Sequence, residues 1–293
     1  MHKIVCFGEV LWDIFPTHKK IGGAPLNVAI RLKSFKNDVA IISAVGNDDL
    51  AKPILQTINN LEINSEAVSV LDDYTTGEVT VTLNEKGAAT YKIVHPKAWD
   101  KIPFTKAATE LVKQAHAFVF GSLITRDEIS KYTLYQLLEF AKYAIFDVNL
   151  RAPFYTKEIL VELMQKADFI KFNDDELYEI STFLGSPFHN LEQNIHFIAQ
   201  KTKTAHICVT KGEHGAVLLY GNELFYNSGY KIKVVDTVGS GDSFLASLIS
   251  KLINGSTPQK AIDFACAVGA LVAQHEGANP ILTEKEIADF TCL

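Results

Sequence analysis

A glycine loop that leads into an apolar helix is the part of this sequence best suited to chemistry. The loop runs from Asp236 to Asp242 with the sequence DTVGSGD, and residues 244–253 then place apolar side chains at helical spacing. Gly239 and Gly241 allow backbone N–H groups to face one point, and the start of the following helix adds the positive end of its dipole. This combination predicts an anion-binding loop.

Asp242 stands at the mouth of this loop, where the N–H groups and the helix dipole favour an ionised carboxylate. Beside a bound phosphate, such a carboxylate can accept the proton of a hydroxyl group that attacks a phosphoryl group. Because Asp is also a favoured N-cap residue, the alternative from spacing alone is that Asp242 only caps the helix. We further expect residues 230–235 to form a strand that runs into the loop.

Two familiar nucleotide-binding motifs are absent. The sequence contains no GxxxxGK[ST] phosphate loop, and Phe244 stands where a GxGxxG motif would need its third glycine. The glycine pair also lies far from the first strand, where a dinucleotide fold would place it. A dehydrogenase is therefore a minor alternative.

The cysteines and histidines provide no ligand set for a transition metal. No CxxC pair and no HExxH motif occurs. We therefore expect reduced, unpaired thiols. The four cysteines are Cys6, Cys208, Cys266 and Cys292.

Alternating strands and helices must position the glycine loop. Helical patterns or turns follow each strand-like run, and residues 25–35 form one such apolar helical face. This rhythm predicts an α/β fold with one doubly wound, mainly parallel sheet flanked by helices. Without a repeat or long polar linker, residues 1–293 are expected to form a single domain. The strand-like runs are residues 4–11, 39–45, 117–120, 144–149, 168–172 and 206–210.

Residues 75–95 interrupt this rhythm. Residues 76–83 alternate with period two, residues 84–87 have turn composition, and residues 89–94 return, which predicts a β-hairpin. Together with residues 12–21 the hairpin could form a small sheet that acts as a lid or an interface; the alternative is an ordinary edge hairpin of the main sheet. We accordingly expect inserted lid segments at residues 12–22 and 75–100.

Charge and hydropathy exclude several classes of partner. The chain has 28 basic and 34 acidic residues, a net charge of −6, and no run of basic residues, so binding to a nucleic-acid backbone is disfavoured. The longest uncharged apolar stretch, residues 264–273, is far shorter than the roughly 20 residues needed to cross a bilayer. The N-terminal apolar run is too short for a signal peptide. A cytoplasmic protein without membrane partners is predicted.

At both ends the sequence resembles the ribokinase-like (PfkB) family of carbohydrate kinases. The DTVGSGD loop is similar to the family's DTxGAGD signature, with Ser240 in place of alanine, and residues 22–29 (GGAPLNVA) resemble its N-terminal signature. The resemblance covers essentially the whole chain. It implies a ribokinase-like fold, Asp242 as catalytic base, and Gly239, Ser240 and Gly241 as the anion hole.

On the sugar side the resemblance points to residues near the N-terminus, in the middle of the chain and in the glycine loop. Asp13 could accept two sugar hydroxyls, and Asn27 offers both a donor and an acceptor near a helix start, unless it is merely a residue on the helix face. Residues 146–151 (FDVNLR) resemble a DxNxR element that faces the cleft, although Arg151 could be a plain surface ion-pair partner. The sugar-binding residues implied are Asp13, Gly22, Gly23, Asn27, Asn149, Arg151 and Asp242.

On the nucleotide side, Asn173 and Glu176 match an NxxE element that organises Mg²⁺ and phosphate through water in relatives. Cys266 would line the adenine pocket, although a buried core thiol explains it equally well. A K⁺ site beside the anion hole would use Asp236 and backbone carbonyls. The remaining nucleotide-binding residues implied are Thr210, Lys211, Gly212 and Gly215; the K⁺-binding carbonyls are those of Val238, Val272, His275 and Gly277.

The substrates implied are ATP and a small sugar. The segment Gly8–Pro16, the GGAPLNVA run and the stretch around Trp99 look like those of bacterial fructokinases, so fructose is the expected acceptor and fructose 6-phosphate the product. Ribose, 2-keto-3-deoxygluconate or a nucleoside are alternative acceptors. A protein of this fold that senses sugar without catalysis is the alternative of another class. Pairing of lid hairpins could also form a homodimer.

Overall fold

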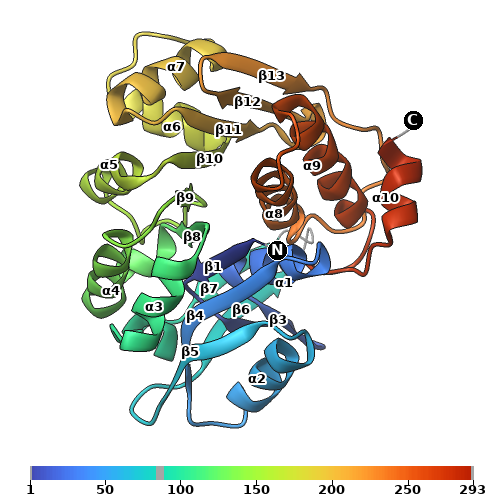
Figure 1. The fold of residues 1–293 in the computed structure, drawn as a ribbon. Helices are drawn as coiled ribbons and strands as arrows, with labels where there is room; N and C mark the ends of the chain where they lie inside the picture. The colour runs from blue at the N-terminus through green and yellow to red at the C-terminus, as the bar shows by residue number, and fades with distance from the viewer. Residues whose placement is uncertain (1, 84–88, 292–293) are drawn as a thin grey trace.

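Nine strands form the central sheet in the part of the chain that the structure, a computed structural model, describes: residues 2–83 and 89–291 (Figure 1). The order is β13-β12-β11-β10-β9-β8-β1-β4-β5. The seven strands from β11 to β5 are parallel, and β12 and β13 complete one edge antiparallel. Their bounds are β1 Lys3–Phe7, β4 Asp38–Gly46, β5 Asn64–Leu71, β8 Ala117–Gly121, β9 Ala144–Asp147, β10 Phe169–Asn173, β11 His206–Thr210, β12 Ala216–Tyr220 and β13 Glu223–Asn227.

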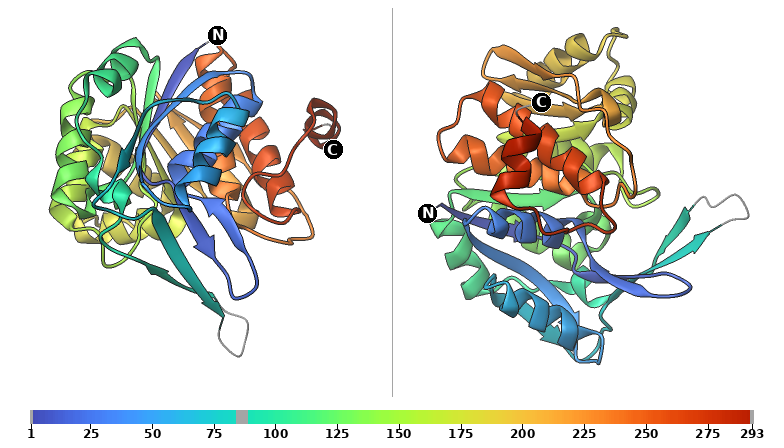
Figure 2. Two further views of the ribbon diagram at one scale, coloured as in Figure 1. Left: turned by 90° about the horizontal axis from the view of Figure 1, so that it is seen from below. Right: turned by 90° about the vertical axis from the view of Figure 1, so that its right-hand side faces the viewer.

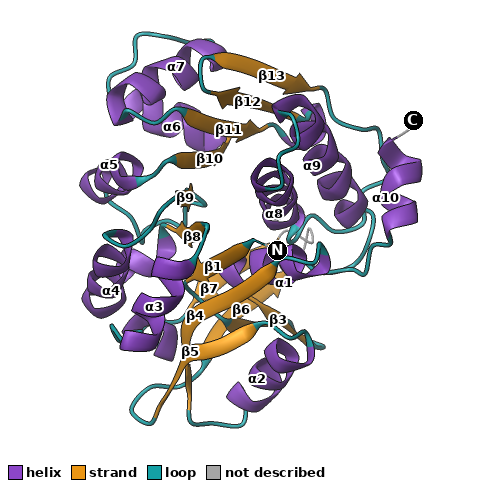
Figure 3. Ribbon diagram, viewed as in Figure 1, coloured by secondary structure: helices purple, strands orange, loops and turns teal. Residues whose placement is uncertain are grey.

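Helices cover both faces of this sheet, so the prediction of a doubly wound α/β fold is confirmed (Figure 3). One face carries α3 Lys106–Gln114, α4 Glu128–Leu138, α5 Lys157–Lys166, α6 Asp174–Phe183 and α7 Leu191–Thr202. The other carries α1 Ala24–Ser34, α2 Ala51–Asn60, α8 Ser240–Ile253 and α9 Pro258–Ala273. Outside these layers lie α10 Glu284–Thr291 and three short 3₁₀ helices, η1 Ala98–Lys101, η2 Leu123–Arg126 and η3 Gly212–His214.

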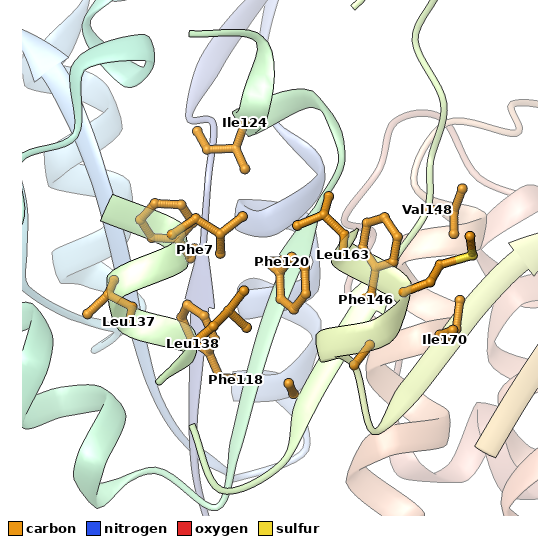
Figure 4. Close-up of a cluster of buried hydrophobic side chains, with 14 of the residues drawn as sticks. Phe7, Phe118, Phe120, Ile124, Leu137, Leu138, Phe146, Val148, Leu163 and Ile170 are labelled. Carbon is orange, nitrogen blue, oxygen red and sulfur yellow. The ribbon is translucent and has the colours of Figure 1, made fainter. Parts of the chain in front are cut away.

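Alternate residues of each central strand enter opposite cores, because successive side chains of a strand point to opposite faces. On β1, Phe7 packs into the core beneath α3 to α7, whereas Cys6 packs into the core beneath α1 and α8. In the first core, Phe120 of β8 stacks with Phe118 of the same strand and with Phe146 of β9 (Figure 4). Both cores fix the strand ends that carry the site. Because apolar side chains enter both faces, the central strands read as continuous hydrophobic runs.

Four further strands form a separate small sheet in the order β3-β2-β6-β7. It projects from the main body (Figure 2). The small sheet expected from the hairpin and the early segment is present, although its first strand begins at Leu11, one residue before the predicted range 12–22. The alternative of an edge hairpin of the main sheet is wrong. The predicted turn at residues 84–87 lies outside the described residues. The bounds are β2 Leu11–Ile14, β3 Lys19–Gly22, β6 Gly77–Leu83 and β7 Ala89–Ile93.

Two predicted strands differ from the observed ones. The run at residues 4–11 is split, since β1 ends at Phe7 and β2 begins at Leu11, in the other sheet. The expected strand at residues 230–235 does not form. Val234 and Val235 are exposed, and the N–H of Val235 donates to the carbonyl oxygen of Ala273 at the end of α9. A helix end therefore holds this segment in place of a neighbouring strand.

No helix among the described residues has both the length and the apolar character needed to span a bilayer. Cys6, Cys208 and Cys266 are free and buried, whereas Cys292 lies outside the described residues.

Candidate active site

The predicted turn from glycine loop to helix is present at the start of α8. Gly239 precedes the helix with a φ of 74°, and a side chain there would meet Ala278 at 2.5 Å, so glycine is required. Ser240 already donates its N–H to Thr237. In the described part of the chain, the N–H groups of Gly241 and Asp242 have no backbone acceptor. Two N–H groups at a helix N-terminus are thus free to bind an anion.

Asp242 is the third residue of α8, and Gly239 occupies the cap position, so the alternative that Asp242 only caps the helix is wrong. Its Oδ2 accepts a hydrogen bond of 2.8 Å from Nδ2 of Asn27 on α1. Burial, together with the charge of Asp147, raises the pKa of Asp242 to about 6, although Asn27 and Lys171 act in the opposite direction. A carboxyl with this pKa is ionised at neutral pH and still basic enough to accept a proton.

The predicted sugar-side residues lie where the small sheet meets α1. The carboxylate of Asp13 on β2 lies directly against Gly22 at the end of β3, in space that any side chain on Gly22 would need. Gly23 then starts α1 with a φ of 110° and packs against the backbone of Glu9. Burial raises the pKa of Asp13 to about 6, partly offset by Arg151. The glycine pair therefore brings α1 close to Asp13.

A small cavity of about 10 Å³ lies at the base of this region and has room for roughly one water molecule. Glu9, Ser122, Asp147 and Asn149 are among its lining residues. Glu9 is buried, its Oε1 accepts the N–H of Ala24 at 3.3 Å, and burial raises its pKa to about 7. The cavity therefore offers several polar groups to a ligand hydroxyl.

Asn149 and Arg151 follow β9 at the same edge of the sheet. Asn149 has a φ of 40° and lines the small cavity. Arg151 is exposed and forms no ion pair with any residue that the structure describes. Its charge lowers the pKa values of Asp13, Glu9 and Asp242, although burial outweighs it. The alternative of a surface ion-pair partner is therefore not seen.

A buried charge cluster lies beneath the glycine loop. Nζ of Lys171 on β10 is 3.0 Å from Oδ1 of Asp147 on β9, and it lies 3.6 Å from the position of a Cβ on Gly241. Burial would lower the pKa of Lys171, but the carboxylates of Asp147 and Glu176 outweigh it and hold the pKa above its usual value. Oδ2 of Asp147 is buried and has no hydrogen-bond partner in the described part of the chain. The lysine stays cationic under the anion-binding loop.

Asn173 and Glu176 form a capping box at the start of α6. Asn173 Oδ1 accepts the N–H of Glu176 at 2.7 Å, and Glu176 Oε2 accepts the N–H of Asn173 at 2.8 Å. Glu176 Oε1 also accepts the N–H of Leu150. Burial raises the pKa of Glu176, whereas Lys171 lowers it. The element is thus fixed next to the charge cluster.

A cavity of about 530 Å³ opens beside the glycine loop, between η3 and α9. It reaches Ser240 and Gly241, so a ligand in it can extend to the anion-binding loop. Cys266 lines the cavity and is 7% exposed. This agrees with a place in the adenine pocket and equally with a buried core thiol. Lys211 and Asn173 do not line the cavity. The other predicted residues that do are Thr210, Gly212 and Gly215.

The carboxylate of Asp236 joins the glycine loop to a distant segment. Its Oδ1 accepts the N–H of Val238 at 3.0 Å, and its Oδ2 accepts the N–H of Gly277 at 2.9 Å. Two of the segments expected at a K⁺ site therefore meet at Asp236. The carbonyl oxygen of Val272 accepts the N–H of His275.

Residues 1–285 match the family described as "pfkB family carbohydrate kinase". The chain belongs to the PfkB family. It is therefore a carbohydrate kinase. Curated relatives include a probable chloroplastic fructokinase-6 of Arabidopsis thaliana, 28% identical over 97% of this chain and 80% of that protein. Fructokinase-2 of Solanum lycopersicum is 27% identical over 95% of this chain and 92% of that protein.

Solved structures show the same PfkB fold. A fructokinase double mutant from Vibrio cholerae O395, in a form with fructose, ADP and potassium ion bound, aligns with a TM-score of 0.85 at 22% identity over 99% of this chain and 98% of that chain. Aminoimidazole riboside kinase from Salmonella enterica, complexed with aminoimidazole riboside and an ATP analogue, aligns with a TM-score of 0.83 at 22% identity over 99% and 100%.

Sequence reasoning missed four residues of this PfkB site. Glu9 lies in the segment Gly8–Pro16 and Asp147 in residues 146–151, but sequence patterns assigned roles only to other residues in these segments. Lys171 had a signal, since a lysine within the buried strand sequence FIKFN needs a partner. Asn279 had none, because its partner Asn27 is 252 positions away.

Proposed function

We propose that this kinase transfers the γ-phosphoryl group of ATP to the C6 hydroxyl of fructose and forms fructose 6-phosphate. The observation that supports this most directly is the group around Asp242: a carboxyl with a pKa of about 6, beside two free helix N-terminal N–H groups. Whole-length similarity to plant fructokinases at 27–28% identity favours fructose.

Asp242 is the base in this proposal. It accepts the proton of the attacking hydroxyl as that oxygen forms a bond to the γ-phosphorus, and ADP leaves with the electrons of the broken bond. Asn27 supports the carboxylate by donating to Oδ2, so Oδ1 remains free for the sugar. Asp13 accepts further sugar hydroxyls, and Gly22 and Gly23 allow the close approach.

The anion hole supplies the charge stabilisation. The N–H groups of Gly241 and Asp242, with Gly239 and Ser240 shaping the turn, face the transferred group at the positive end of the α8 dipole. Lys171 adds a buried positive charge below the loop. These groups are fixed before the reaction and need little reorganisation during it.

The residues present fit a magnesium ion that binds with ATP. Among the described residues, no group of three or more His, Cys, Asp or Glu could hold a metal alone, but Mg²⁺ normally binds through substrate phosphates, waters and one or two carboxylates. Glu176 would hold it through water, with Asn173 beside it. When bound, Mg²⁺ neutralises phosphate charge. Asp236 would take part in a K⁺ site next to the anion hole.

The large cavity is the proposed nucleotide site. Thr210, Gly212 and Gly215, which line it, would follow the phosphates and ribose, with Lys211 next to them in the sequence. Cys266 would lie at the adenine end, opposite Ser240 and Gly241.

The small sheet acts as the lid over the sugar in this proposal. Its segments, residues 12–22 and 75–100, belong to one domain with the main sheet. Closing the lid excludes water, which would otherwise hydrolyse ATP. The outer strands β3 and β7 leave free edges at which a second copy could pair.

A coupled assay of ADP release tests the proposal. Fructose, ribose, 2-keto-3-deoxygluconate, aminoimidazole riboside and adenosine are compared under the same ATP and Mg²⁺ concentrations. We expect the largest kcat/KM for fructose. A larger value for another acceptor would overturn the substrate, and no release with any acceptor would favour a sensor.

A further inference from the structure

Asn279 lies in the segment that follows α9 and is held on both sides. Gly277 donates its N–H to Asp236, and the carbonyl oxygen of Pro280 accepts a hydrogen bond of 2.9 Å from the buried guanidinium of Arg31. Ala278 packs against Gly239. The backbone on either side of Asn279 is therefore tied to the glycine loop and to α1.

The side chain of Asn279 is the outer end of a hydrogen-bonded chain to Asp242. Its Nδ2 donates to Oδ1 of Asn27 at 2.8 Å, and Nδ2 of Asn27 donates to Oδ2 of Asp242 at 2.8 Å. Asn27 is buried on α1. The three residues come from three parts of the chain and meet only in the fold.

The chemistry of the carboxylate fixes the direction of this chain. An ionised carboxylate only accepts hydrogen bonds, so Asn27 must present its amide nitrogen to Asp242 and its oxygen to Asn279. Asn279 must then present its own nitrogen. Oδ1 of Asn279 is buried and has no hydrogen-bond partner among the residues that the structure describes, so the side chain is held through its donor Nδ2 and not through its acceptor.

We propose that Asn279 is a positioning residue for phosphoryl transfer: it holds the Asn27 amide in the orientation that donates to Asp242. Within this series of hydrogen bonds, only Asp242 and Asn279 distinguish the two flips of the Asn27 amide. Without Asn279, Asp242 alone would have to do so. The flipped amide would place an oxygen against the carboxylate and displace it. This inference rests on the proposed role of Asp242 as base.

The test compares Asn279→Asp with Asn279→Ala. The aspartate is almost the same size but cannot donate, and it repels the Asn27 oxygen; the alanine removes the donor without adding charge. We expect kcat to fall about 10- to 100-fold for the aspartate and about 10-fold for the alanine, with KM for ATP changed less than about twofold. Ile281→Asp, which adds the same charge at a 91% exposed side chain, is the matched control and should keep wild-type kcat.

Two further readouts separate positioning from a purely structural role. Loss of the Asn27 hydrogen bond should move the acid limb of the kcat/KM profile to higher pH, because that bond lowers the pKa of Asp242. The charged groups that face Asp242 are Asp147, Lys171, Arg151 and Glu9, and all remain in these variants. In an Asn27→Ala background, Asn279→Ala should have no additional effect on kcat.

The outcomes are distinct. If Asp242→Asn keeps wild-type turnover, the proposed function itself is wrong. If Asp242→Asn is inactive but both Asn279 variants keep wild-type kcat and pH profile, only the role of Asn279 is wrong. Additive losses in the double variant would likewise overturn it. Thermal unfolding of each variant identifies misfolding, and if the aspartate variant fails to fold, the alanine variant decides.

Discussion

Two buried ion pairs, Arg126–Asp100 and Lys171–Asp147, are built differently. Where the small sheet joins the main body, Arg126 donates hydrogen bonds of 2.6 and 2.8 Å to the two oxygens of Asp100. Its Cζ lies 3.9 Å from the centroid of the Trp99 ring. Arg126 also donates to the carbonyl of Val94, and Asp100 accepts the N–H of Lys97. Both carboxylate oxygens are satisfied.

The pair beneath the glycine loop is less complete. Lys171 and Asp147 share one hydrogen bond of 3.0 Å, and the second Asp147 oxygen has no partner within residues 2–83 and 89–291. Glu176 and Asp242 add two more carboxyls, and burial raises the pKa of both. The cluster therefore has three carboxyl groups and one lysine.

The difference indicates what each pair does. A bidentate pair in which both carboxylate oxygens are bonded fixes the geometry of a junction, although Nη1 of Arg126 has no hydrogen-bond partner among the described residues. An incompletely bonded cluster under an anion-binding loop leaves polar groups available to a ligand and lowers the free energy of unfolding. Corresponding substitutions in the two regions should therefore separate activity from stability.

The largest effect is expected for Asp242→Asn, which removes the base while keeping its size. Turnover should fall by about 10²- to 10⁴-fold, whereas Tm should be unchanged or higher because a half-buried charge is lost. The ADP-release assay and a thermal melt measure both. Asp289→Asn, at an exposed position on α10, is the control. Wild-type turnover in Asp242→Asn would contradict its role.

Asp100→Asn is the same chemical change in the other region, where the small sheet joins the main body, and should have the opposite outcome. It leaves the buried Arg126 without its charge partner, which costs about 3–5 kcal/mol of unfolding free energy. Folded protein should keep most of its turnover. Denaturant unfolding measures the loss, with exposed Asp72→Asn as control. An Asp100→Leu/Arg126→Met double variant should regain part of the lost unfolding free energy. A stability equal to wild type in Asp100→Asn would contradict a structural role for this ion pair.

The pH dependence of stability should report the carboxyls of the site. Burial raises the pKa of Glu9 from 4.5 to about 7, so between these values the folded protein binds more protons than the unfolded chain. Stability therefore falls as the pH rises through this window, and Asp13 and Asp242, with pKa values of about 6, act in the same direction.

For the ligand-free protein we expect Tm to rise when the pH is lowered from about 8 to about 5.5. Glu9→Gln should stabilise at pH 8 by about 1–3 kcal/mol and flatten this dependence, whereas Glu66→Gln, at an exposed position, should not. A pH dependence of Tm that is the same in Glu9→Gln as in the wild type would show that Glu9 does not carry this cost.

The smallest effect is expected where the small sheet touches the segment after α9. Lys20 of β3 and Glu276 lie 2.7 Å apart, but their side chains are 32% and 73% exposed. Solvent and salt screen such a pair, so Glu276→Gln should leave Tm unchanged at low and high salt. If Glu276→Gln destabilised the protein as much as Asp100→Asn, solvent exposure would not explain how much each ion pair contributes to stability.

Local pattern was enough to predict the loop at residues 236–242, the helix after it and the main strands, because hydrophobic period and glycine placement act over a few residues. It failed at residues 230–235. There the sequence resembles a strand, but the segment pairs with no strand among the described residues, and a helix end accepts the Val235 N–H instead. Pairing partners are set by the fold and not by the run itself.

The sequence by itself determined the family, the order of strands and helices, and the carboxylate that faces the anion-binding loop. Tertiary structure alone decided which distant groups meet that carboxylate. Asn27 and Asn279 approach Asp242, and Lys171 approaches Gly241, because strands and helices far apart in the chain end at one edge of the sheet. Hydrogen bonds and charges act over a few ångströms of space, whatever the separation in sequence.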